Sequence, residues 1–239
     1  HSPMYFFLAN LSLTDACFIS ASIPRMLANI HTQSWTISYS ECLVQLYFLI
    51  LFGGLDNFLL AVMAYDRYVA ICQPLYYNTA MSPQLCALML GMCWVLSSFA
   101  ALLHTLLLTR VVFCVHEAIR HFYCDPRALL KLACSDTHIN EVMLITMGLM
   151  FLTTPLMLII LSYVRISCAV FGISSSTGQW KVFSTCGSHL TVVLLFYGSL
   201  MGVYLLPPST HSPDRESRAA ILYMVIIPML NPIIYSLRN

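Results

Sequence analysis

Charged side chains are scarce in this sequence. Asp, Glu, Lys and Arg together make up 9% of its 239 residues, while hydrophobic residues make up 59%. A soluble domain carries about 25% charged residues. So few charges cannot cover a globule of this size with solvated side chains, although a protein embedded in lipid needs no such cover. The deficit therefore excludes an ordinary soluble domain and indicates a membrane protein.

The charges are also missing from long continuous stretches. None occurs at 68–109, 142–164, 182–213 or 219–237. A membrane-spanning helix needs about 20 predominantly apolar residues. Counting between polar breaks predicts six spans, roughly at 3–29, 42–72, 84–108, 139–168, 181–206 and 215–238. The runs lack the alternation of barrel strands, so we expect an all-α transmembrane bundle forming one domain over 1–239.

The beginning of the chain lacks the basic region that opens a signal peptide. The sequence instead begins with His1-Ser2-Pro3-Met4, directly at the start of a predicted helix. We interpret this start as an N-terminal truncation.

Four of the ten cysteines gather on one side of the predicted membrane. Cys42 opens the second span, and Cys114, Cys124 and Cys134 lie ten residues apart in a long loop at about 110–138. Two disulfides would persist only in an oxidising compartment, which places this loop outside the cell. Zinc is the competing ligand, since His116, His121 and His138 are interleaved, but no paired C-x2-C or H-x3-H cluster occurs. We favour disulfides; residue spacing alone leaves three pairings open.

The distribution of Lys and Arg argues for the opposite orientation. With the long loop outside, the inner side holds four basic residues and the outer side holds seven, whereas inner loops are usually the richer in Lys and Arg. Four of the seven lie in the one long loop, and an absent first helix would usually dominate topology. We keep the orientation that the cysteines and motifs indicate.

Five ordered motifs are more specific than composition. They are PMYFFL at Pro3–Leu8, MAYDRYVAIC at Met63–Cys72, Ser162-Tyr163, KVFSTCGSHL at Lys181–Leu190 with Phe196-Tyr197-Gly198, and PMLNPIIYSLRN at Pro228–Asn239. An Asp-Arg pair at a helix end is by itself explained by two charged side chains reaching the interface. The full set of motifs, covering essentially the whole chain, resembles the odorant-receptor branch of the rhodopsin-like G-protein-coupled receptors.

The resemblance implies a seven-helix receptor fold, of which this chain would hold the second to seventh helices. It also implies a multi-pass protein of the plasma membrane, and not an enzyme. Such a receptor binds a small lipophilic or volatile odorant in the outer half of the bundle and activates a stimulatory, olfactory-type heterotrimeric G protein, which raises cAMP. Membrane lipid is the other expected partner, and we expect no nucleic acid, no metal and no cofactor beyond a sodium ion or proton.

The resemblance assigns a signalling switch and two disulfides. The switch comprises Asp66, Arg67, Tyr68, Tyr163 and Tyr235. Arg67 would pair with Asp66 at rest and open toward the G protein, and the inner tyrosines Tyr163 and Tyr235 would stabilise the active state. By the same match, the disulfides would be Cys42–Cys124 and Cys114–Cys134.

Asp15 and Asp56 are each the sole carboxylate deep inside an apolar span. An ionisable residue inside a membrane is a functional-site hypothesis by default. Two neighbouring carboxylates cannot both stay charged without a cation or a shared proton. The resemblance places them with Asn231 in a sodium or proton site, which we favour over two separately protonated, hydrogen-bonded acids.

A ligand site is predicted around one face of the second span. Ile50, Gly53, Gly54 and Asn57 share a helix face, where two glycines either leave a cavity or allow close helix packing. The predicted lining consists of Ile50, Gly53, Gly54, Met147, Phe151, Tyr197, Leu200 and Tyr204. Tyr197 resembles the family's aromatic pivot beneath the ligand. A largely apolar lining suits a lipophilic molecule, and methionines allow loose selectivity.

The chain departs from the family on its inner face. No basic residue occurs near Tyr76, and Gln179 stands where Arg is common. We therefore expect weaker coupling to the G protein. Because the absent first helix would leave its neighbours uncovered, we also expect poor folding, retention in the endoplasmic reticulum and weak signalling.

Other functional classes find less support in the sequence. A six-helix channel or transporter is the main alternative, but it predicts pore-lining charges or an inverted repeat, and neither is present. An intramembrane enzyme would need a paired-His metal motif or a Ser-His-Asp arrangement. A non-olfactory receptor fits the strings at Pro3–Leu8 and Lys181–Leu190 poorly.

Overall fold

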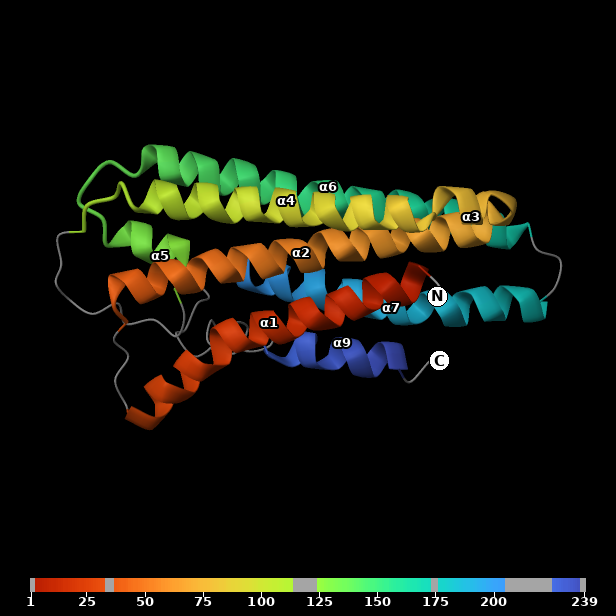
Figure 1. The fold of residues 1–239 in the computed structure, drawn as a ribbon, viewed down its shortest axis with the longest axis horizontal. Coiled ribbons are helices and arrows are strands. Elements are labelled where there is room, and N and C mark those ends of the chain that lie inside the picture. The colour runs from red at the N-terminus through yellow and green to blue at the C-terminus, as the bar shows by residue number, and fades with distance from the viewer. Residues whose placement is uncertain (1–2, 33–36, 114–123, 173–175, 205–224, 237–239) are drawn as a thin grey trace.

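The computed structural model of the chain describes residues 3–32, 37–113, 124–172, 176–204 and 225–236. Its long helices run side by side along one axis and form an elongated bundle (Figure 1). These helices are α1 (Pro3–Thr32), α2 (Tyr39–Cys72), α4 (Pro83–Leu108), α6 (His138–Phe171), α7 (Ser176–Tyr204) and α9 (Ile227–Ser236). Three short segments, η1 (Pro74–Tyr76), α3 (Tyr77–Ala80) and α5 (Pro126–Lys131), lie at the ends of the bundle.

Five helices are long and apolar enough to cross a membrane. Their apolar segments are Pro3–Ala28, Tyr39–Cys72, Pro83–Leu108, His138–Phe171 and Val182–Gly202. The first five predicted spans and the all-α fold class are thereby confirmed. The sixth predicted span lies partly outside the described residues, and its described part contains α9. Within the described residues, β pairing is confined to an isolated bridge between Phe113 and Ala133.

Helix α2 runs through the centre of the bundle and packs against α1, α4, α6 and α7. In the most apolar 18-residue stretch of α2, 56% of the residues are buried, compared with 28% in that of α4 and 11% in that of α6. A central helix must bury residues on several faces, because neighbours surround it. Most side-chain hydrogen bonds between separate segments of the bundle therefore involve α2.

Side-chain caps explain where two of the helices begin. The Ser38 hydroxyl accepts a hydrogen bond from the Glu41 N–H, and the Glu41 carboxylate accepts one from the Ser38 N–H. This capping box satisfies two N–H groups at the start of α2, which begins three residues before the predicted span. Ser82 caps α4 in a similar way, and Pro83 occupies the first helical position, where its missing N–H costs nothing.

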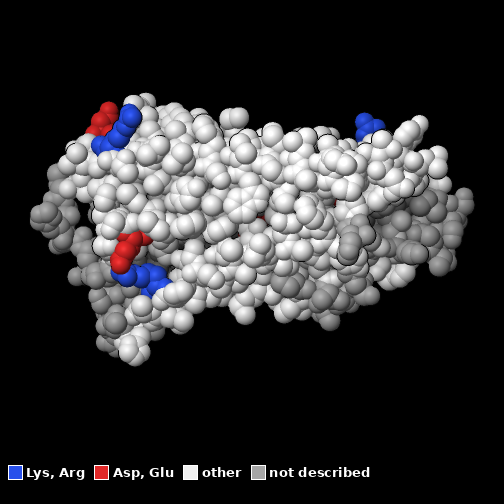
Figure 2. Space-filling model, in the orientation of Figure 1, with Lys and Arg blue, Asp and Glu red and all other residues white. Residues whose placement is uncertain are grey.

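The outward faces of the helices are apolar. On α4 the exposed large side chains are Leu88, Met92, Trp94, Val95, Leu96, Phe99, Leu102 and Leu106. Figure 2 shows one face of the molecule as a broad band without charge, with charged side chains confined to regions near its ends. A surface of this kind suits the hydrocarbon core of a bilayer, which is about 30 Å thick.

Candidate functional site

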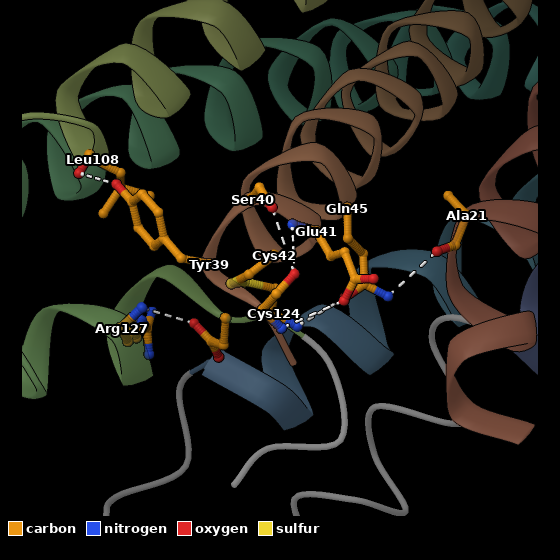
Figure 3. The surroundings of a disulfide bond; sticks show 11 residues. Ala21, Tyr39, Ser40, Glu41, Cys42, Gln45, Leu108, Cys124 and Arg127 are labelled. Atoms are coloured by element: carbon orange, nitrogen blue, oxygen red, sulfur yellow. Dashed lines mark hydrogen bonds between the residues drawn. A yellow bond between two sulfur atoms is a disulfide. The ribbon is translucent and has the colours of Figure 1, made fainter. Parts of the chain in front are cut away.

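A disulfide between Cys42 and Cys124 joins the start of α2 to the loop before α5, with the two Cα atoms 5.4 Å apart (Figure 3). The predicted pairing of these cysteines is confirmed. Cys134 is also disulfide-bonded. Its predicted partner Cys114 lies outside the described residues, as do two of the histidines of the zinc alternative.

Gln45 reinforces this end of the bundle from one turn further along α2. Its Nε2 donates to the Ala21 carbonyl of α1 at 3.3 Å, and its Oε1 accepts from the Cys124 N–H at 3.2 Å. Figure 3 shows Gln45 between these two partners, next to the disulfide. One buried amide therefore connects α1, α2 and the disulfide-bonded loop.

Two further contacts hold α2 at the same end. Arg25 of α1 forms an ion pair with Glu41, with 3.2 Å between Nη1 and Oε2. The Tyr39 hydroxyl donates to the Leu108 carbonyl at the end of α4, at 3.0 Å. The end that we predicted to be extracellular is thus cross-linked by the Cys42–Cys124 disulfide and by several polar contacts.

The three residues of the predicted ion site lie together in the middle of the bundle. Asp15, Asp56 and Asn231 come from α1, α2 and α9, and each is at most 4% exposed. The Asn231 amide Nδ2 lies 3.1 Å from both carboxylate oxygens of Asp15. Asp56 is close enough to Asp15 to interact with it electrostatically. Within the described residues, Oδ1 of Asp56 and Oδ1 of Asn231 have no hydrogen-bond partner.

The predicted ligand residues Tyr197 and Phe151 meet at Asn57. The Tyr197 hydroxyl donates to Oδ1 of Asn57, and Nδ2 of Asn57 donates to the Phe151 carbonyl. The Phe151 ring packs edge-on against Phe58, with 5.3 Å between the ring centroids. These contacts bring α2, α6 and α7 together around one buried amide.

The remaining predicted ligand residues divide between two levels. Leu200 is buried in the same apolar cluster as Tyr197. Ile50 lies nearer the disulfide, where it packs against clusters that contain Leu46 and Leu51.

Four members of the predicted lining contribute less to the described site. Met147 is half-buried on α6, and Gly53 is half-buried on α2. The side chain of Tyr204 lies outside the described residues. Gly54 faces α4, because a Cβ atom there would lie 3.0 Å from Oγ of Ser97. The structure thus favours close helix packing, rather than a cavity, at Gly54.

Asp66 has a hydrogen-bond partner that the sequence did not predict. No ion pair between Asp66 and Arg67 occurs among the described residues; instead the Tyr77 hydroxyl donates to Oδ1 of Asp66 at 2.9 Å. The charges of Asp66 and Arg67 nevertheless attract each other, and our expectation of a resting Asp66–Arg67 pair stays a prediction.

The other predicted switch residues lie around the same end of α2. The Tyr163 hydroxyl is 2.8 Å from Nδ1 of His189, whose Nε2 is 3.1 Å from the Leu60 carbonyl. A carbonyl only accepts hydrogen bonds, so Nε2 carries the proton and the Tyr163 hydroxyl donates to Nδ1. His189, with no exposed surface, thereby links α2, α6 and α7.

Two polar atoms at this end are buried without a hydrogen-bond partner among the described residues. They are Nε of Arg67 and the hydroxyl of Tyr235. Tyr235 belongs to the same apolar cluster against which Tyr163 packs. Tyr68, the fifth predicted switch residue, is half-buried and accepts a hydrogen bond from Gln73 at 3.2 Å.

Four residues with central contacts were not among the predicted site residues. These are Gln45, Asn57, Tyr77 and His189. For three of them the sequence did carry a signal, because Gln45, Asn57 and His189 are polar residues within apolar spans. Tyr77 carried none, since a tyrosine after a helix end is ordinary.

Comparison with known proteins agrees with this arrangement. The family model of the olfactory receptors matches residues 1–239. The chain is 81% identical over 239 residues to "Olfactory receptor 1N2" of Homo sapiens, and 56% identical to "Olfactory receptor 1f45" of Rattus norvegicus. Each match covers all of this chain and 76% of the relative.

A crystal structure of squid rhodopsin shows the same fold. The TM-score is 0.77, the sequence identity is 18%, and the match covers 99% of this chain and 68% of that one. The predicted seven-helix receptor fold is thereby confirmed. Olfactory receptors are multi-pass membrane receptors and not enzymes, so the channel and enzyme alternatives are set aside. The chain belongs to the olfactory receptor family of G-protein-coupled receptors.

Proposed function

We propose that this chain detects a small lipophilic odorant between α2, α6 and α7, and activates a stimulatory, olfactory-type G protein from the plasma membrane. The disulfide end would face outward and the end with Arg67 would face the cytoplasm. The observation that carries the proposal is that, among the described residues, Nε of Arg67 and the hydroxyl of Tyr235 are buried without a hydrogen-bond partner. A buried polar group without a partner costs about 1–3 kcal/mol. A rearrangement that gives these groups partners is therefore favoured.

The G-protein part of the proposal is tested by cAMP measurements. Cells that express the chain and an olfactory-type stimulatory Gα subunit are exposed to a panel of volatile odorants. We expect Arg67→Ala to abolish the odorant-evoked cAMP rise at matched surface expression. The control is Arg127→Ala, an exposed arginine near the disulfide end, which should leave the response unchanged. An undiminished response in Arg67→Ala would contradict the proposal.

The position of the ligand is tested by comparing two substitutions on α6. Phe151 is half-buried and contacts Phe58, whereas Leu149, two residues away on α6, is 57% exposed. We expect Phe151→Ala to raise the odorant concentration for half-maximal response at least tenfold, because truncating a half-buried aromatic side chain removes contact area with the ligand. Leu149→Ala should leave that concentration unchanged. Equal effects of the two substitutions would place the ligand elsewhere.

We also propose that Asp15, Asp56 and Asn231 bind a sodium ion or share a proton. The proposal is supported by two buried carboxylates close together, and by one oxygen each of Asp56 and Asn231 that has no hydrogen-bond partner among the described residues. Sodium should raise the melting temperature of the solubilised receptor above its value in an equal concentration of a large organic cation. Asp56→Asn should remove that increase, and Asp136→Asn, in a loop, should keep it. An increase that survives in Asp56→Asn would contradict a sodium site, and a melting temperature independent of both sodium and pH would contradict a shared proton as well.

A further inference from the structure

Two free cysteines from different helices lie near each other at the Arg67 end of the bundle. Cys72 is the last residue of α2, and Cys168 lies in the last turn of α6. The Cys72 thiol donates a hydrogen bond to the Arg165 carbonyl of α6, with 3.7 Å between Sγ and the oxygen. The end of α2 is therefore held against the turn of α6 that starts at Arg165.

Helix geometry places Cys168 next to the same carbonyl. Residues three apart are neighbours on a helix surface, so Cys168 follows Arg165 along one side of α6. At the end of this helix, a Cβ atom on Gly172 would lie 3.3 Å from the carbonyl oxygen of Ala169, three residues earlier. The Cβ atom of Cys168 stands in the same relation to the Arg165 oxygen. Both cysteines are therefore neighbours of one carbonyl, and their thiols are close enough to interact electrostatically.

Apolar packing keeps the two helix ends side by side. Ile166 and Val170 of α6 belong to a buried cluster, and Ile71 and Cys72 of α2 pack against that cluster. A disulfide joins Cα atoms about 4.4–6.8 Å apart, so it can form only where two backbones approach closely. The packing of α2 against α6 provides such an approach at the positions of the two thiols.

The two thiols can also be reached by an oxidant. Cys168 is exposed and Cys72 is half-buried, whereas Cys93 of α4 is buried. Arg165 is exposed as well, and a charged side chain near a helix end reaches the boundary between membrane and water. Cys168 lies one turn closer to the helix end, so it is accessible from the aqueous side.

We infer that Cys72 and Cys168 form a redox-sensitive pair, which hydrogen peroxide oxidises to a disulfide that joins the ends of α2 and α6. Peroxide first converts the exposed Cys168 thiol to a sulfenic acid and releases one water. The Cys72 thiol then attacks that sulfur, and the sulfenic oxygen leaves as a second water. In total the two thiols lose two electrons and two protons, and one peroxide becomes two waters.

Oxidation fits this pair better than metal binding does. A structural zinc ion takes four ligands, and within the described residues no group of three or more metal-ligating side chains occurs. The cytosol keeps thiols reduced, and the disulfides that do form there are usually transient and redox-sensing. The inference rests on the proposed function only for this cytoplasmic location. The pair would then add a reversible covalent link at the end of the bundle that lies opposite the Cys42–Cys124 disulfide.

Peroxide treatment of the solubilised chain tests the inference. The chain is exposed to hydrogen peroxide, its remaining thiols are alkylated, and a proteolytic digest is analysed by mass spectrometry with and without dithiothreitol. We expect a cross-linked pair of peptides that contain Cys72 and Cys168, lighter than the two reduced peptides by two hydrogen atoms. Two free thiols per chain should be lost, and dithiothreitol should restore both.

Matched variants show whether the pair is specific. Cys168→Ser and Cys72→Ser should each abolish the cross-link, and serine at position 72 can still donate to the Arg165 carbonyl. Cys93→Ala, at a buried cysteine of α4, should keep the cross-link. Oxidation should also raise the melting temperature of the unsubstituted chain by about 4 °C or more, because a disulfide typically contributes about 2–4 kcal/mol. The melting temperature of Cys168→Ser should not rise.

Several results would overturn the inference. They are a cross-link from Cys72 to Cys186, oxidation of Cys168 to a sulfinic acid without any cross-link, and a cross-link that joins two chains, seen as a doubled mass without reductant. None of these measurements uses an odorant or a G protein. A chain that forms the disulfide but gives no odorant-evoked cAMP would contradict only the proposed function. A chain that signals without forming the disulfide would contradict only the inference.

Discussion

The two ends of the bundle are held together by different kinds of contact. At the disulfide end, α1, α2 and the loop before α5 are joined by a covalent bond and by the Gln45 side-chain amide, which donates one hydrogen bond and accepts another. At the opposite end the links are hydrogen bonds, those of Asp66 with Tyr77 and of Tyr163 with His189. In the part of the chain that the structure describes, Nε of Arg67 and the hydroxyl of Tyr235 have no hydrogen-bond partner there. The first end is built to keep one geometry, while the second can exchange its partners.

This difference indicates that the helices can rearrange at a lower cost in free energy at the Arg67 end than at the disulfide end. Breaking a disulfide requires a chemical reaction, whereas a hydrogen bond that is exchanged for another costs little net free energy. We therefore expect changes at the disulfide end to act on stability and changes at the Arg67 end to act on signalling. Four substitutions, two in α2 near the disulfide, one in α7 and one at the start of α2, test whether stability and signalling separate in this way.

Cys42→Ser should have the largest effect. The disulfide closes a loop of 82 residues, and loss of a disulfide typically costs about 2–5 kcal/mol. We expect a large fall in melting temperature and in the amount of receptor at the cell surface. Cys168→Ser, at an exposed free cysteine, is the control and should change neither. An unchanged melting temperature in Cys42→Ser would contradict the expectation that the disulfide end determines stability.

Gln45→Leu should act on stability alone. The substitution leaves the buried N–H of Cys124 without its acceptor, which costs about 1–3 kcal/mol. The melting temperature of the solubilised receptor should fall, while cAMP per surface receptor should not change. Altered basal signalling in this variant would show that the disulfide end also takes part in activation.

His189→Phe should show the opposite pattern. The ring loses its contacts with Tyr163 and Leu60, but phenylalanine keeps most of the packing, so the loss of stability should be only about 1–2 kcal/mol. Basal cAMP per surface receptor should change at least twofold, because Tyr163 is freed. Unchanged basal and odorant-evoked cAMP would mean that this bridge is only structural.

Tyr39→Phe should have the smallest effect. The hydroxyl makes one hydrogen bond, to the Leu108 carbonyl, and the residue is 40% exposed. Its removal should cost about 0.5–1 kcal/mol, with no change in signalling. A fall in melting temperature as large as that of Gln45→Leu would show that exposure is a poor guide at this end.

The sequence predicted the spans well but not where the helices end. An apolar run records which residues lie in lipid, whereas a helix continues into water as long as its hydrogen bonds are satisfied. Accordingly α7 begins at Ser176, although its apolar run begins at about 181, and α2 begins at Tyr39 because Ser38 caps it.

The candidate site was predictable in membership and not in pairing. Asp15, Asp56 and Asn231 stood out as polar residues in apolar spans, and the structure brings them together. The partner of Asp66 could not be read in the same way, because Tyr77 approaches it from a separate segment after the helix end. For the same reason Asn57 stood out as a polar residue, but the sequence gave no indication that its amide would meet Tyr197 and the Phe151 carbonyl.

The scarcity of charge and its spacing therefore determined by themselves that this protein lies in a membrane as a helical bundle, because a bilayer accepts few other structures. The motifs determined its family. Only the tertiary structure decided which buried polar groups meet, since a hydrogen bond within a bundle depends on the relative rotation and depth of two helices. Neither quantity is encoded in the composition of either helix alone.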